Sequence, residues 1–261
     1  MKRKIVKTAD GSYTFKFEGF KECFHSINGA YTESMHIFIQ NGLRFYIDNL
    51  LEESNTQVAN INILEVGFGT GLNCILTAVS AKEYPNIQIK YNTIEKHPLT
   101  TEEFEGLQYK TLFTQEWNST IDRIHACSWD QNEKINDNFV LLKKKCKIEE
   151  LQLDEEIAKL QLDEKTARLT DRSIKLIDGY LADIVYYDAF SPNIQPHLWS
   201  RDLFKGVYNL MNNNAILVTY SAKGDVKRAL RDAGFYVTRK KGPPGKRHIT
   251  VARKIVREVT L

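Results

Sequence analysis

The chain has 261 residues, of which 42% are hydrophobic, and it carries a formal net charge of +3. This length suits one α/β domain with an appendage, and the charge is too small to identify a polyanionic partner. No apolar run reaches 18 residues and the first residues lack the apolar centre of a secretory signal, so we expect a cytoplasmic protein without a membrane span. The four cysteines are scattered and the six histidines lack partners at metal-binding spacing, so we predict neither a disulfide framework nor a metal site.

Residues 1–58 are predicted to form a small N-terminal appendage, a β-hairpin followed by a helix. Apolar and polar residues alternate over residues 4–18 on both sides of Asp10-Gly11, a pair that favours a tight hairpin turn. The apolar spacing over residues 35–53 favours a helix that is interrupted or bent near Asn41-Gly42.

The main domain, residues 59–261, begins with the strand, helix, strand rhythm of a parallel sheet with crossover helices. The first three elements are INILEV (61–66), GLNCILTAVSAKEY (71–84) and IQIKYNTIE (87–95). The later elements are a helix over 97–107 capped by Thr100 or Thr101, a strand at 139–145, a buried central strand at 182–190, a helix over 197–211, a strand at 215–221, a helix over 224–234 closed by Gly234, and an antiparallel pair, 235–241 and 247–254, around a GPPG turn.

A charged surface insertion is predicted at about residues 148–181. It contains a near-repeat, LQLDEEIAK followed directly by LQLDEKTAR, which a short duplication explains. Its weak periodicity fits either a charged helix or an added hairpin.

The stretch LEVGFGTGLN (64–73) places three glycines at the end of the first strand of the main domain. Gly67, Gly69 and Gly71 are spaced G-x-G-x-G, whereas a dinucleotide fingerprint would need a glycine at Leu72. With the acid Glu65 before it, this loop resembles the first motif of S-adenosylmethionine-dependent methyltransferases, in which glycine allows the backbone to approach the methionine part and the sugar.

Two further acids follow strands. Glu95 ends the next strand, where a carboxylate can accept hydrogen bonds from both ribose hydroxyls of a nucleoside. Asp188 follows the buried strand at the edge where such sheets place their chemistry, although acids at this position also cap helices.

The C-terminal part is basic. Residues 223–257 contain twelve lysines and arginines against two aspartates, Asp225 and Asp232. This pattern fits contact with a phosphate backbone or, alternatively, a solvated basic surface.

Four segments together resemble the N-terminal methyltransferase domain of the tRNA-modifying MnmC family and its stand-alone relatives. They are GAYTESMHIFIQNGL (29–43), LEVGFGTGLN with TIEKHPLT (64–73 and 93–100), YYDAFSPNIQPHLWSRDLF (186–204) and TYSAKGDVKRALRDAGFYVTRKKGPPGKR (219–247). The DAFSP sequence, with Pro-x-x-Trp downstream, is the most diagnostic of these.

The resemblance implies a Rossmann-like methyltransferase fold with a mostly parallel sheet and an antiparallel C-terminal strand. It implies methyl transfer from S-adenosylmethionine to the amine of 5-aminomethyl-2-thiouridine at the tRNA wobble position, with the anticodon arm as the bound partner. The family's flavin oxidoreductase domain has no counterpart in this sequence, so a separate flavin oxidoreductase is expected to supply the amine.

The resemblance also implies site residues. For the cofactor these are Glu65, Gly67, Phe68, Gly69, Thr70, Gly71, Asn73, Glu95 and Lys96. For the tRNA substrate they are Glu33, Phe190 and Pro192, while Asp188 falls on the family's catalytic acid. For RNA contact we favour the basic stretch around the GPPG turn, above all Arg239, Lys240, Lys241, Lys246 and Arg247.

Two positions depart from the family pattern. Cys146-Lys147 stand where an acid usually contacts the adenine amino group, and His248 follows Lys246-Arg247 where the family has glutamate. Two alternatives stay open. One is an enzyme that acts on a small-molecule amine, against which the basic C-terminal stretch argues. The other is a non-catalytic RNA- or nucleotide-binding relative, which Lys147 in place of an acid keeps open.

Overall fold

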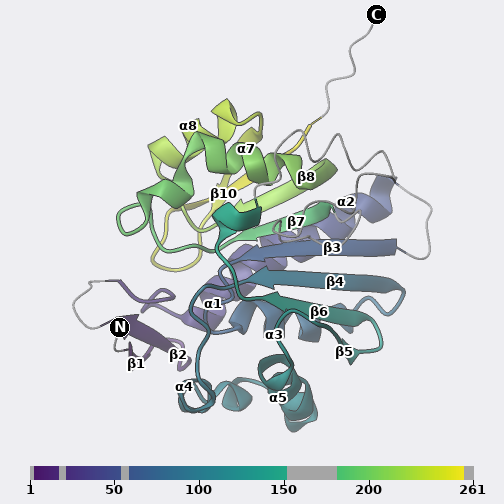
Figure 1. Ribbon diagram of the computed structural model, residues 1–261, viewed down its shortest axis with the longest axis vertical. Coiled ribbons are helices and arrows are strands. Elements are labelled where there is room, and N and C mark those ends of the chain that lie inside the picture. The colour runs from purple at the N-terminus through teal and green to yellow at the C-terminus, as the bar shows by residue number, and fades with distance from the viewer. Residues whose placement is uncertain (1–2, 18–21, 54–58, 152–180, 256–261) are drawn as a thin grey trace, which may run out of the picture.

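The computed structural model describes residues 3–17, 22–53, 59–151 and 181–255 (Figure 1). Most of the predicted charged insertion, residues 152–180, lies outside the described residues. Its first residues form a short 3₁₀ helix, η4 (Ile148–Leu151).

The core of the described chain is a mostly parallel sheet, as the sequence predicted. Its strand order is β5-β6-β4-β3-β7-β8-β10-β9. The parallel strands are β3 (Ala59–Val66), β4 (Ile87–Ile94), β6 (Phe139–Lys144), β7 (Ala182–Tyr187) and β8 (Met211–Thr219). The antiparallel strands are β9 (Tyr236–Lys241) and β10 (His248–Arg253) at one edge and β5 (Asn132–Asn136), which the sequence did not predict, at the other.

Both faces of this sheet are buried, which explains the nearly continuous apolar runs of its central strands. In β3, Ile61 and Ile63 belong to one hydrophobic cluster, whereas Leu64 and Val66 belong to the other. Because side chains alternate along a strand, each cluster lies on one face of the sheet.

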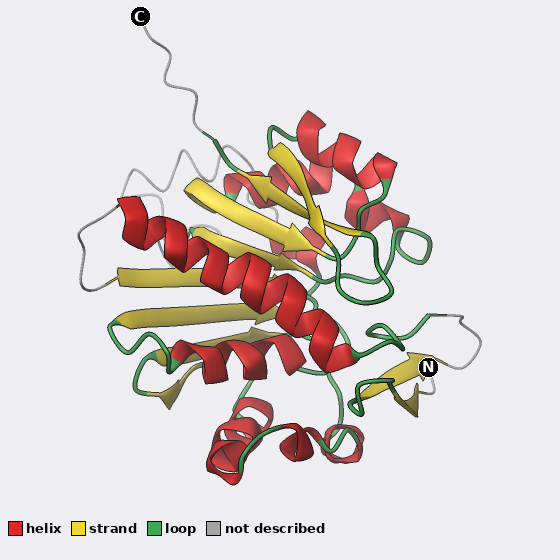
Figure 2. Ribbon diagram, turned by 180° about the vertical axis from the view of Figure 1, so that it is seen from behind, coloured by secondary structure: helices red, strands yellow, loops and turns green. Residues whose placement is uncertain are grey.

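Helices cover the two faces in separate layers. The first layer contains α1 (Ala30–Ser34), η1 (Met35–Arg44), α2 (Phe45–Glu53) and α3 (Leu72–Ala81); the second contains α7 (Arg201–Asn209) and α8 (Gly224–Asp232). Figure 2 shows the long helix of the first layer crossing the sheet. Beside these layers lie α4 (Thr101–Gly106), α5 (Asn118–Ala126) and the 3₁₀ helices η2 (Tyr109–Leu112), η3 (Gln115–Trp117) and η5 (Pro196–Trp199).

The long helix differs from its prediction. We expected an interruption or a bend near Asn41-Gly42. The helix is not interrupted, since it continues from Ala30 to Glu53, but its middle section, η1, which contains both residues, is a π-helix. Gly42 serves close packing instead of ending the helix, because a Cβ there would lie 3.0 Å from Cε1 of Tyr186. The helix therefore lies directly against strand β7.

Two predicted helix boundaries are confirmed. Thr100 caps α4 in a capping box, in which its side chain accepts from the Glu103 N–H and the Glu103 carboxylate accepts from the Thr100 N–H. Gly234, with φ of +107°, follows α8 in the left-handed region that glycine adopts without strain.

The predicted hairpin is also present, as β1 (Arg3–Lys7) paired with β2 (Tyr13–Phe17). It lies beyond the carboxyl ends of β3 and β4 (Figure 1). The helix that follows is buried against the main sheet, with Ile37, Ile39 and Leu43 fully inaccessible to solvent. The division of the chain at residue 58 stays a prediction.

Candidate active site

A cavity of about 450 Å³ lies at the carboxyl edge of the sheet, within the range of roughly 300–1,000 Å³ usual for small-molecule sites. Its walls come from residues 22–26, Glu33, the glycine loop 66–70 with Leu72 and Asn73, residues 94–97, residues 146–149, residues 188–191 with Gln195, His197 and Leu198, and finally Tyr220 and Lys246. Segments far apart in the sequence therefore meet around one space.

The glycine loop touches the segment that carries Asp188. Gly67 has φ of +93°, and a Cβ on it would come within 2.9 Å of the Asp188 carbonyl oxygen. The Gly67 N–H donates to the carbonyl of Ile94 at 3.0 Å, and the Asp188 N–H donates to the carbonyl of Val66 at 3.0 Å. The loop and the acid therefore share one backbone framework.

The substitution Gly67→Ala is expected to destabilise the protein by about 2–4 kcal/mol, because alanine adds both left-handed strain and a backbone clash. Thermal unfolding measures this loss. Gly11→Ala is the matched control, since Gly11 has φ of +88° but nothing within 4 Å of its Cβ position, and it should cost only about 1 kcal/mol. Equal losses for the two variants would exclude the clash.

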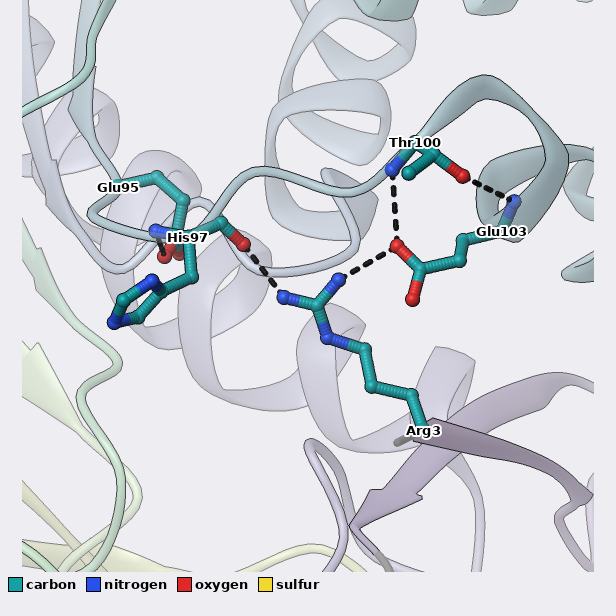
Figure 3. Close-up of polar contacts among 5 residues, drawn as sticks. All are labelled: Arg3, Glu95, His97, Thr100 and Glu103. Atoms are coloured by element: carbon teal, nitrogen blue, oxygen red, sulfur yellow. Dashed lines mark hydrogen bonds and ion pairs between the residues drawn. The ribbon is translucent and has the colours of Figure 1, made fainter. Parts of the chain in front are cut away.

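Glu95 lies at the rim of this loop, at the carboxyl end of β4. Its Oε2 accepts from the Gly69 N–H at 3.0 Å and its Oε1 accepts from the His97 N–H at 2.7 Å (Figure 3). Each carboxylate oxygen has a second lone pair, so the group can still accept from two ribose hydroxyls.

The structure brings most of the expected cofactor residues to the cavity wall, namely Gly67, Phe68, Gly69, Thr70, Asn73, Glu95 and Lys96. Glu65 and Gly71 do not line it. Glu65 is fully buried and accepts from the Thr93 hydroxyl at 2.8 Å, and its burial raises its pKa to about 8. At Gly71, a Cβ would lie 2.6 Å from Nε2 of His125, so this glycine permits close packing behind the loop.

Asp188 lines the cavity from the end of β7. Its Oδ2 accepts from the Asn73 amide at 2.9 Å. Burial raises the pKa of Asp188 to about 7, and the nearby Glu33 carboxylate adds to this rise, while the Asn73 hydrogen bond and Lys246 oppose it. A carboxyl group with this pKa can accept a proton near neutral pH.

Among the expected substrate residues, Glu33, Phe190 and Lys246 line the cavity. Lys246 Nζ lies 2.5 Å from Glu33 Oε1 and 4.3 Å from the centre of the Tyr220 ring, and the Tyr220 hydroxyl donates to the carbonyl of Ala189. Pro192, Arg239, Lys240, Lys241 and Arg247 lie outside the cavity lining.

The loop before α1 is the part of the site that the sequence analysis missed. The Glu22 carboxylate accepts from the Ser191 hydroxyl at 2.5 Å, and the Ser26 N–H donates to Glu33 at 2.7 Å. The Phe24 ring packs edge-on against Phe190, with 5.1 Å between ring centres. No motif marks these residues, because they reach the site only through tertiary contacts.

The departure at Cys146-Lys147 also lies at the cavity. Cys146 and Ile148 are 8% and 6% exposed, so an adenine ring would meet an apolar wall here. The Lys147 N–H donates to the Glu150 carboxylate. Glu149, whose carboxylate lies 3.5 Å from Nε2 of His197, is an acid of this segment that lines the cavity.

Two features are absent from the described residues. No group of three or more His, Cys, Asp or Glu side chains there could hold a metal ion. No helix there is both long and apolar enough to cross a membrane.

Comparisons with known proteins show which proteins this chain resembles. A family model described as S-adenosyl-L-methionine-dependent methyltransferase matches residues 130–255. The "tRNA 5-methylaminomethyl-2-thiouridine biosynthesis bifunctional protein MnmC" of Cupriavidus metallidurans is 29% identical over 246 residues, which are 90% of this chain and 31% of that protein. The MnmC protein of Pseudoalteromonas atlantica is 29% identical over 252 residues, 90% of this chain and 31% of that protein. The chain thus spans about a third of the length of these relatives.

Other similar proteins are shorter. An uncharacterized protein of Methanocaldococcus jannaschii is 27% identical over 96% of this chain and 59% of its own length. The crystal structure of MnmC2 from Aquifex aeolicus has a TM-score of 0.64 and 24% identity, covering 96% of this chain and 70% of that chain, and it shows the shared fold.

The fold, the cavity and the match of residues 130–255 to the family model all point to S-adenosylmethionine-dependent methyltransferases as the class that this chain resembles. Within this class the chain is MnmC-like, which confirms the resemblance predicted from its four sequence segments.

The cavity suits S-adenosylmethionine as the cofactor. Its volume, the backbone exposed by the glycine loop, and the Glu95 carboxylate at the end of β4 match the needs of a nucleoside with an amino acid tail. Asp188 in the same cavity would favour the positive sulfonium when its carboxyl group is ionised.

Proposed function

We propose that this protein methylates the primary amine of 5-aminomethyl-2-thiouridine at the wobble position of tRNA, giving the 5-methylaminomethyl product. The observation that carries the proposal is Asp188, an acid with a raised pKa that faces the cavity beside the glycine loop. The named product of the MnmC relatives supports this choice of substrate. We place the reaction in the cytoplasm, with a separate flavin oxidoreductase supplying the amine.

The chemistry explains why the site needs a base. An aliphatic amine has a pKa near 10, so it reaches the site mainly as an ammonium ion, which has no free lone pair. Asp188 accepts one proton from this ammonium, and partial removal of the amine from water in the cavity favours the neutral form that results.

S-adenosylmethionine supplies the methyl group on a positive sulfonium that leaves as a neutral thioether. Asp188 holds the amine nitrogen on the axis of transfer, and Phe190 bounds the space for the uracil ring. With the cofactor bound, the amine nitrogen would form its bond to the methyl carbon as the carbon–sulfur bond breaks, which would give a secondary ammonium. Asp188 would then release to solvent the proton that it took from the substrate.

The Glu33–Lys246 ion pair bounds the substrate side of the cavity. The charges of Glu33 and Lys246 compensate each other. The pair therefore does not attract an acidic substituent on the uracil ring. Glu33 also acts on Asp188 by raising its pKa.

A direct assay tests the proposal. tRNA from cells that lack the protein would be incubated with purified protein and S-adenosylmethionine, and its nucleosides analysed by mass spectrometry. We expect 5-aminomethyl-2-thiouridine to be consumed as the 5-methylaminomethyl nucleoside appears. Methylation of a free small-molecule amine, with no change in tRNA, would favour the first alternative. No binding of S-adenosylmethionine would favour the second, a non-catalytic relative.

The tRNA would contact the basic edge formed by β9 and the GPPG turn. Arg239, Lys241 and Arg247 are exposed there. Partial burial and the charges of Arg239, Arg247 and Lys227 lower the pKa of His248, so these cations create one positive field. Lys240 differs, since its Nζ lies 4.8 Å from the centre of the Phe45 ring, where it packs on the long helix.

Combined substitution of Arg239, Lys241 and Arg247 by glutamine is expected to weaken tRNA binding at least about tenfold and to flatten its salt dependence, because phosphate contacts release counterions. Filter binding over a series of salt concentrations measures both effects. The same substitution of three exposed lysines elsewhere, Lys82, Lys110 and Lys134, is the matched control. Equal effects of the two triple variants would contradict a localised tRNA surface.

A further inference from the structure

Arg3 of the N-terminal hairpin reaches the loop that carries Glu95. Its Nη1 donates to Glu103 Oε2 at 2.6 Å and its Nη2 donates to the carbonyl of His97 at 2.7 Å (Figure 3). Only 12% of the Arg3 side chain is exposed, so water screens these contacts less than those of an ordinary surface ion pair.

The backbone of His97 connects Arg3 to the proposed ribose site. The carbonyl of His97 accepts from Arg3. The N–H of the same residue donates to Glu95 Oε1 at 2.7 Å. The other oxygen of Glu95 accepts from the Gly69 N–H at 3.0 Å. A continuous series of contacts thus runs from the hairpin through Glu95 to the glycine loop.

The loop is held at three points. Glu95 is fixed to Gly69 at its start, and the capping box fixes Thr100 at its end. Arg3 holds the middle at His97 and also contacts Glu103, the acid of that capping box (Figure 3).

Apolar contacts keep the hairpin at this position. A Cβ on Gly106 would lie 2.4 Å from Cδ1 of Ile5, so the hairpin packs closely on α4. The Arg3 guanidinium lies 6.0 Å from the centre of the Phe24 ring, and Phe24 itself lies against Gly69, with its Cδ1 at 3.3 Å from that residue's Cβ position. The hairpin therefore lies beside Phe24, which lines the cofactor cavity.

We propose that Arg3 is a positioning residue for the binding of S-adenosylmethionine. It holds the backbone of His97 in place, so that Glu95 presents its carboxylate oxygens to the ribose. The proposal rests on the cofactor part of the proposed function and not on tRNA as the substrate. It differs from a general stabilising role in one respect: the effect of Arg3 on cofactor affinity depends on Glu95.

The test measures the Kd of S-adenosylhomocysteine by calorimetry for Arg3→Gln and Arg3→Lys, together with the Tm of each. Arg3→Gln is expected to weaken binding about tenfold, because two charge-assisted hydrogen bonds are lost. Arg3→Lys, which keeps the charge but not the two-pronged geometry, should fall between this variant and the unmodified protein. Arg44→Gln is the matched control. It breaks the Arg44–Glu83 ion pair, whose nitrogen and oxygen atoms also lie 2.6 Å apart but which does not line the cavity, and it should leave the Kd unchanged.

A double-mutant cycle separates positioning from mere stabilisation. In a Glu95→Gln background, Arg3→Gln should change the Kd less than about twofold, because the group through which Arg3 acts is already impaired. An unchanged Kd for Arg3→Gln, or the same loss in both backgrounds, would overturn the inference while the proposed function stands. If Arg3→Gln does not fold, Arg3→Lys decides by the same two comparisons. Failure of the unmodified protein to bind S-adenosylhomocysteine would reject the proposed function as well.

Discussion

Asp188→Asn is expected to lower the rate of methyl transfer by about a hundredfold to ten-thousandfold while leaving cofactor affinity nearly unchanged. Asparagine keeps the shape of the side chain and can still accept the hydrogen bond from Asn73, but it cannot take a proton from the substrate ammonium. Single-turnover methylation of tRNA measures the rate, and calorimetry with S-adenosylhomocysteine measures the affinity.

The pH dependence gives this variant a second test. Burial raises the pKa of Asp188 to about 7, so the carboxyl group is protonated and inactive as a base below that pH. The rate for the unmodified protein should therefore rise as the pH increases through about 7, and this inflection should be absent from the residual activity of Asp188→Asn.

Asp183→Asn is the matched control. Asp183 lies at the opposite end of the same strand, is 8% exposed, and also has a pKa raised by burial, but it does not line the cavity. Its loss should leave the rate within about threefold of the unmodified protein. Near-normal turnover of Asp188→Asn, or an equal loss in both variants, would remove Asp188 from the mechanism.

The parts of this site that the sequence could predict are those that local rules encode. A glycine loop after an apolar strand, and acids at the ends of Ile87–Ile94 and Ala182–Tyr187, follow from the way parallel strands deliver their carboxyl ends to one edge. The capping box at Thr100 and the glycine after α8 were predictable for the same reason, because each depends on neighbouring residues alone.

The remaining parts depend on contacts between distant segments. Arg3 and His97 are 94 positions apart in the sequence, and Lys246 reaches Glu33 from the opposite end of the chain. Gly42 shows a different limitation. Its low helix propensity favoured an interruption or a bend, but the helix continues through it and packs closely on Tyr186 of the sheet. Burial against the sheet outweighed local propensity here.

Glu95→Ala is expected to weaken S-adenosylmethionine binding by about a hundredfold or more, since a carboxylate that accepts from two ribose hydroxyls contributes roughly 1.5–3 kcal/mol per hydrogen bond. The variant also releases the Gly69 and His97 N–H groups that Glu95 holds. Glu102→Ala is the control, because it removes the same group from the exposed first turn of α4, and it should bind normally.

A cofactor analogue separates the two effects of Glu95→Ala. S-adenosylhomocysteine without its ribose 2′-hydroxyl should bind the unmodified protein about tenfold more weakly than the complete compound, because one hydrogen bond to Glu95 is lost. Glu95→Ala should bind the two compounds with similar affinity, since the acceptor is already absent. If Glu95→Ala still binds the two compounds with a tenfold difference in affinity, another group accepts the hydrogen bond from the 2′-hydroxyl. Glu95 would then act only by holding the glycine loop in place.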